Sequence, residues 1–110
     1  MLTPLLTAVT PTPVAVPLSV FLTPSSLSTS STNGTYITPT FTANVSGGVK
    51  PYSYNWQVYG EFSLHSESGN TAKAKASGYD AYDTGTIVCI VTDDDSNIVA
   101  GSASLAVSFS

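Results

Sequence analysis

The sequence predicts an all-β fold: an antiparallel β-sandwich of about seven to eight short strands behind an extended N-terminal arm. Apolar and polar residues alternate with a period of two over most of the chain, which is typical of strands with one buried face. Clusters of Gly, Asn and Asp separate these stretches and favour turns. The single tryptophan, Trp56, lies in the middle of one alternating stretch, where its ring would centre a core.

The composition limits the classes of partner. With 110 residues the chain is long enough for one domain. Three Lys, no Arg and seven acidic residues give a net charge of -4. Because this balance does not neutralise a row of phosphates, we expect no nucleic-acid partner and no membrane surface as partner. The one cysteine excludes an internal disulfide, and no apolar stretch approaches the roughly 20 residues of a membrane span.

Residues 1–13 are predicted to form the extended arm. Pro4, Pro11 and Pro13 oppose a helix, and no basic region precedes the apolar residues as in a signal peptide. Apolar side chains are uncommon in free disordered tails. The larger ones in the arm are Leu2, Leu5, Leu6 and Val9. Two alternatives follow: a loose terminus, or an arm that lies on a partner or on a neighbouring subunit.

The first half of the domain contains the neutral strands. A strand is expected over residues 14–22, where Pro17 places it at a sheet edge, and a Ser/Thr-rich continuation with a kink follows. Asn33-Gly34 is a strong signal for a two-residue hairpin. The next strand is expected over residues 36–45, and Gly47-Gly48 turns the chain into the strand of Trp56.

The second half begins with the Trp56 strand, in which Tyr52, Tyr54 and Val58 share the inward face. Further strands are expected over residues 62–64, 71–77, 86–92 and 98–109, joined by turns or loops at 67–70, 78–83 and 93–97. The strand over 86–92 is rich in Val, Ile and Thr throughout, which indicates burial at the centre of a sheet. The domain is thus predicted over residues 14–110.

Two stretches resemble known immunoglobulin-like domains. Asp83-Thr84-Gly85-Thr86-Ile87-Val88-Cys89 resembles the run that opens their sixth strand, and Trp56 stands where they keep a third-strand Trp. Ile87 stands where those domains have a conserved tyrosine, and the other cysteine of their inter-sheet disulfide is missing here. Residues 46–56, with Val91-Thr92-Asp93 downstream, resemble bacterial and bacteriophage Ig-like modules of the polycystic-kidney-disease type. The resemblance implies an Ig-like sandwich, which serves many unrelated functions.

No residue pattern points to a reaction centre. The only histidine, His65, lies next to a predicted turn, and Cys89 lies in the most apolar strand, where a thiol is unreactive. The Asp93-Asp94-Asp95 run lacks the spaced ligands of a calcium loop, which favours solvated turn acids. We therefore predict no enzyme, no metal and no cofactor.

Two functions from different classes follow. The first is a non-enzymatic virion structural protein: a small Ig-like decoration or accessory protein, made in the host cytoplasm, that attaches to phage capsid or tail proteins or to itself. Its N-terminal arm and a sheet edge would make the contacts. A single Ig-like domain that begins with Met1, the lack of an export signal and an apolar arm that needs a partner favour this hypothesis. The alternative is a carbohydrate- or host-surface-binding adhesion module that stacks a glycan on Tyr59, Tyr79 and Tyr82. Scattered surface tyrosines are the simpler interpretation of these three residues.

Overall fold

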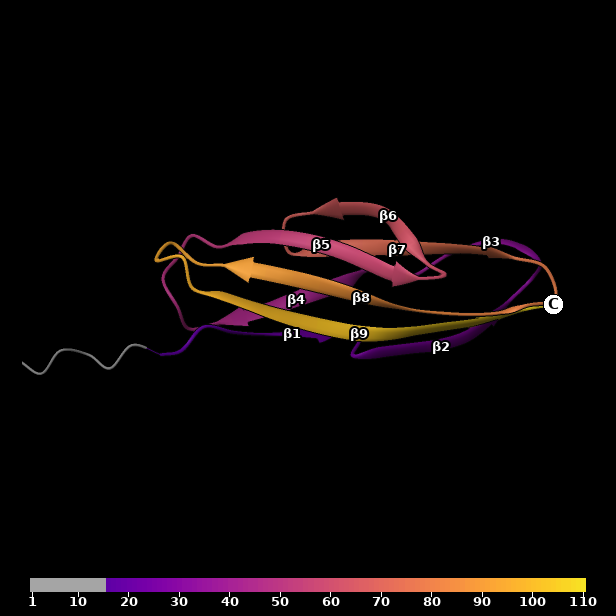
Figure 1. Ribbon diagram of the computed structural model, residues 1–110, viewed down its shortest axis with the longest axis horizontal. Coiled ribbons are helices and arrows are strands. Elements are labelled where there is room, and N and C mark those ends of the chain that lie inside the picture. Colours follow the sequence, from indigo (N-terminus) through magenta and orange to yellow (C-terminus); the bar gives the residue numbers. More distant parts are fainter. Residues whose placement is uncertain (1–15) are drawn as a thin grey trace, which may run out of the picture.

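The computed structural model describes residues 16–110, which form nine strands in two sheets (Figure 1). One sheet contains β1 (Ser19–Thr23), β3 (Gly34–Ile37), β4 (Phe41–Ser46), β6 (Ser63–Ser68) and β7 (Thr71–Gly78). The other contains β2 (Ser26–Ser31), β5 (Ser53–Gly60), β8 (Tyr82–Thr92) and β9 (Ile98–Phe109). No helix in this part of the chain is long and apolar enough to cross a membrane. The predicted arm, with Leu2, Leu5, Leu6 and Val9, lies outside the described residues.

The strand order is that of an immunoglobulin-like sandwich. Strands β1, β4, β7 and β6 follow one another across the first sheet, and β9, β8 and β5 lie side by side in the second. This is the arrangement of the two sheets in constant-type immunoglobulin domains. All strand pairs are antiparallel except β2 with β9, which run parallel. The predicted all-β sandwich of mostly antiparallel strands is confirmed, with nine strands in place of seven or eight.

The strand predicted over residues 36–45 is divided into β3 and β4. Both pair with β7, but Ile37 lies opposite Lys75 while Phe41 lies opposite Ala72, so one extra residue bulges out between them. The buried Thr38 holds this bulge. Its backbone N–H donates to the Ala74 carbonyl at 2.9 Å, and its hydroxyl oxygen accepts the Ala74 N–H at 3.0 Å.

The hairpin predicted at Asn33-Gly34 is wrong. The chain crosses between sheets here, because β2 pairs with β9 and β3 pairs with β7. Asn33 instead ties together the far end of the sandwich. Its side-chain oxygen accepts the backbone N–H of Asp80 at 2.9 Å, and its backbone N–H donates to the Ser110 carbonyl at 3.3 Å.

The first strand starts later than predicted. It begins at Ser19 rather than at residue 14, and Val16 is 65% exposed, whereas Leu18 and Leu22 are buried. Strand β1 does lie at a sheet edge, as Pro17 indicated. After Thr23 the chain moves to the other sheet, so the Ser/Thr-rich continuation becomes β2.

Trp56 lies in the core between the sheets. Its side chain is 3% exposed, and the indole N–H donates to the Gly69 carbonyl at 2.9 Å. It belongs to a single cluster of buried residues to which both sheets contribute, including Phe41, Ile87 and Leu105. Its predicted strand neighbours Tyr52, Tyr54 and Val58 are half-buried and pack against this cluster.

Candidate interaction surfaces

One end of the sandwich is organised around the side chain of Asp93, which follows β8 and is 5% exposed. Its Oδ1 accepts the backbone N–H groups of Asp95 at 3.0 Å and Asn97 at 2.8 Å. Its Oδ2 accepts the backbone N–H of Val49 and the side-chain amide of Asn97, both at 3.0 Å. The carboxylate therefore closes the β8–β9 turn and ties it to the loop between β4 and β5.

The expectation that the turn acids are solvated is wrong for Asp93, although Asp94 and Asp95 are exposed. Burial is possible because N–H donors surround the Asp93 carboxylate, which satisfies its charge. These donors occupy the oxygens that a cation would need. Within residues 16–110, no group of three or more His, Cys, Asp or Glu side chains is placed to hold a metal ion.

Two glycines bring a third segment to the same end. The backbone N–H of Gly48 donates to the Val16 carbonyl at 2.9 Å. A Cβ atom on Gly47 would lie 2.1 Å from the carbonyl oxygen of Pro17, and one on Gly48 would lie 2.8 Å from the Asp93 carboxylate. Both glycines also have positive φ, 72° and 63°. The Gly47-Gly48 turn and the Asp93 turn, which are far apart in the sequence, thus form one structure.

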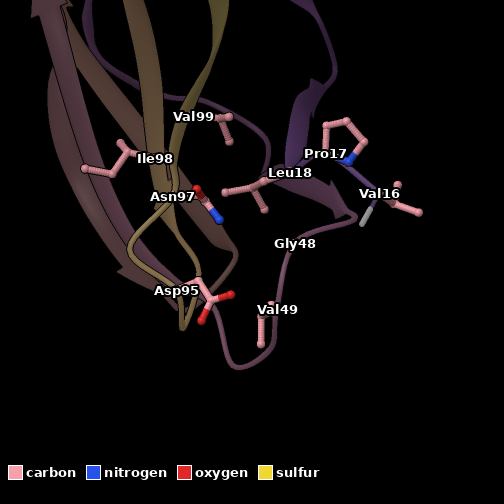
Figure 2. Close-up of a pocket in the computed structure, with 9 residues that line it drawn as sticks. All are labelled: Val16, Pro17, Leu18, Gly48, Val49, Asp95, Asn97, Ile98 and Val99. Atoms are coloured by element: carbon pink, nitrogen blue, oxygen red, sulfur yellow. The ribbon is translucent and has the colours of Figure 1, made fainter. Parts of the chain in front are cut away.

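An apolar groove of about 620 Å³ opens at this end (Figure 2). Its walls are Val16, Pro17, Leu18, Gly48, Val49, Asp95, Asn97, Ile98 and Val99. Val16, Val49 and Ile98 are 65%, 41% and 66% exposed, so the groove presents apolar side chains to the outside. Val16 is also the first described residue, and the chain continues from this wall to residues 1–15.

Comparison with known proteins leaves the groove to be interpreted from its own residues. No protein-family model matches the chain, and no curated protein matches it either. The groove is lined mostly by apolar residues, and Asp95 and Asn97 are its polar lining residues. The Asp93 and Gly47-Gly48 contacts fix those walls in place. Such a geometry suits an apolar segment of another protein more than a small polar substrate.

Strand β5 is an open sheet edge. It pairs with β8 on one side only, its register is regular, and Ser53–Gly60 contains neither a charge nor a proline. Strand β6, an edge of the other sheet, carries Glu67 and a bulge between Leu64 and Ser66. Charges, prolines and bulges are the usual protection of edges against pairing with another chain. Because β5 has none of them, it can accept an added strand.

The three tyrosines of the glycan hypothesis do not gather into one site. Tyr59 on β5 and Tyr82 on β8 share the outer sheet face and are 53% and 64% exposed; Tyr79, 76% exposed, lies in the β7–β8 loop. Tyr59 pairs with Thr86 on β8, and Thr86 is roughly 14 Å from Tyr82 along that strand. This separation is too large for both rings to stack on one sugar. The Tyr59 hydroxyl instead donates to the Gln57 side-chain oxygen.

The two potential catalytic side chains lie in different sheets. His65 is exposed at the bulge of β6, whereas Cys89 on β8 is fully buried opposite Trp56. Burial raises the pKa of the Cys89 thiol to about 11, so the thiol stays protonated at neutral pH. It acts as a small apolar core residue, in keeping with its position in the most apolar strand.

Replacing Asp93 by Asn is expected to destabilise the protein at neutral pH and to weaken the effect of acid on it. Hydrogen bonds from the side chain of Asn97, and from the backbone of Asn97, Val49 and Asp95, lower the pKa of Asp93 from its ordinary value of 3.8. The unfolded chain therefore binds the proton more readily. The stabilisation is complete well above about pH 4 and is lost as the pH falls through the lower, folded-state pKa.

Urea unfolding of the parent protein and of Asp93→Asn between about pH 7 and pH 3 measures this effect. The difference between their free energies of unfolding should shrink as the pH falls. Asp94→Asn is the matched control, because Asp94 is exposed in the same turn. The free energy of unfolding of this variant should follow that of the parent protein at each pH. Equal behaviour of the two variants would show that the Asp93 carboxylate does not hold this end together.

Proposed function

We propose that this protein is a non-enzymatic structural subunit, a small Ig-like decoration or accessory protein of a virion. Its partner would be a phage capsid or tail protein. The observation that supports this most is the exposed apolar groove at the end of the sandwich from which the chain continues to residues 1–15. The resemblance of residues 46–56 to Ig-like modules of bacteria and bacteriophages suggests the virion as the setting.

The groove and the N-terminal arm would act together. Residues 1–13 are uncharged and include Leu2, Leu5, Leu6 and Val9. A segment of that length reaches at most about 45 Å when extended. Arm and groove side chains such as Val16 and Ile98 would therefore contact neighbouring parts of one partner. Burying this apolar surface supplies the main driving force for binding.

The open edge of β5 would add to this attachment. An extended partner segment can pair with Ser53–Gly60 through backbone hydrogen bonds, as in other complexes in which one protein adds a strand to the sheet of another. Each contact is modest by itself. On a repeating lattice, however, neighbouring attachment points raise the effective concentration of each bound copy, so weak contacts suffice.

Mass spectrometry of purified virus particles from the source is the first test. We expect the polypeptide at a fixed ratio to the capsid or tail proteins. Rebinding to particles stripped of it should then weaken by at least about tenfold for a chain lacking residues 1–13 and for Val16→Asp, which charges the groove. Phe21→Asp is the control, because Phe21 is 63% exposed on β1 and is not part of the groove wall.

Absence of the polypeptide from the particles would overturn the proposal, as would full rebinding by the chain lacking residues 1–13. Binding to a glycan that survives this deletion but is lost in Tyr59→Ala would favour the adhesion module instead. Tyr59 provides this distinction because it lies on β5, apart from the groove.

A further inference from the structure

The outer face of the four-stranded sheet carries no charged side chain among the described residues, and two aliphatic residues lie at its centre. Ile87, Cys89 and Val91 on β8 are fully buried, so Val88 and Ile90 point to the opposite, outer side. The sequence predicted that this strand is buried at the centre of a sheet. In the structure the other sheet covers its inner face, and no described element covers the outer one.

The outer face is also uncharged. Val88 lies between Gln57 and Ser102, and Ile90 lies between Asn55 and Ala100. The charged side chains of the described residues lie in loops and turns, on β6 and β7 of the other sheet, or, for Asp83, in the interior. Solvent-facing strands of antiparallel sheets are normally polar on that side. The centre of this face instead places the half-buried Val88 and Ile90 among neutral neighbours, two of which, Asn55 and Gln57, are polar.

We infer that this outer face binds a second copy of the same chain in a two-fold symmetric contact. In such a contact residues near the axis meet their own counterparts, so a charged residue there would face a like charge. The face of Val88 and Ile90 avoids this cost. Each copy carries a net charge of -4, and the uncharged face lets two copies approach with their charged loops kept apart.

The size and shape of the face fit a reversible dimer. Small side chains such as Ala100 and Ser102 let two sheets approach to the usual spacing of about 10 Å. The lengths of β2, β5, β8 and β9 give a footprint of roughly 600 Å² per copy, or 1,200 Å² in total. This total is at the lower end of the range for specific interfaces. We therefore expect the dimer to form only at high protein concentration.

Sedimentation velocity of the full chain from about 5 to 500 µM tests the inference. The parent protein should shift from monomer to dimer across this range. Ile90→Asp and Ser102→Glu place charges on the face from two different strands, and each should weaken dimerisation by at least about tenfold. Phe21→Asp is the control: it places the same charge on the other sheet and should dimerise as the parent does. Far-UV circular dichroism verifies that each variant is folded, and Ser102 is exposed, so its replacement should disturb folding least.

A parent protein that stays monomeric over the whole range would overturn the inference. So would a dimer that persists in both face variants. A dimer that depends on residues 1–13 and not on the sheet face would overturn it as well. The inference is independent of the proposed function, because Val16→Asp should weaken attachment to the particle while leaving the dimer intact. Failure of one test therefore does not imply failure of the other.

Discussion

Replacing Trp56 by Ala is expected to remove about 3–5 kcal/mol from the free energy of unfolding. The indole ring is 3% exposed between the two sheets, and its loss leaves a cavity there. The Gly69 carbonyl would also lose the indole N–H that donates to it at 2.9 Å. Domains of this size have only about 5–15 kcal/mol in total, so a large share of the molecules should unfold under mild conditions.

Urea unfolding followed by far-UV circular dichroism measures this loss, since the variant has no tryptophan to report by fluorescence. Tyr59→Ala is the matched control: Tyr59 lies on the same strand but is 53% exposed on the outer face. Its replacement should cost no more than about 0.5–1 kcal/mol. Similar losses in the two variants would mean that the ring of Trp56 is not a central packing element.

The period-two pattern was sufficient to predict the two-layer fold. Ala72, Ala74 and Ala76 show why, because alanine and lysine favour helices, yet these three residues form the buried face of β7. Alternation decides the structure here because only a strand places all three alanines on the core side while the lysines face outward. The inward position of Trp56 followed from the same reasoning.

Strand pairing could not be predicted from local patterns. Asn33-Gly34 has the composition of a hairpin turn, but β2 and β3 join different sheets, and β2 pairs in parallel with the distant β9. A turn propensity describes the bend and contains no information about which edge the next strand will find. That choice depends on which arrangement buries both inner sheet faces, a property of the whole chain.

The candidate site was only partly visible for the same reason. The Gly47-Gly48 turn and the Asp93 turn stand out in the sequence, but their contact joins residues far apart in the chain, such as Val49 and Asp93. Val16 shows a second difficulty. The sequence placed Val16 inside a strand over residues 14–22, whereas the strand begins only at Ser19 and Val16 is exposed on the groove wall.

Replacing Gly47 by Ala tests whether this contact builds the groove. Two costs add at this position. An Ala with φ near 72° costs about 1–2 kcal/mol, and its Cβ would lie 2.1 Å from the Pro17 carbonyl oxygen, so backbone must move at a further cost of about 1–3 kcal/mol. We expect a total loss of about 2–5 kcal/mol and a displacement of Val16 and Pro17 from the groove.

Gly69→Ala is the matched control for the backbone cost alone. Gly69 also has a positive φ, 56°, but a Cβ there would meet nothing within 4 Å, so only about 1–2 kcal/mol should be lost. Urea unfolding compares the two variants, and partner binding is then measured at a temperature where both are folded. Gly47→Ala should bind more weakly than Gly69→Ala because the Val16 wall has moved. Equal stability and equal binding would show that the approach of Pro17 to Gly47 is not needed, and the groove would then depend on the Asp93 hydrogen bonds alone.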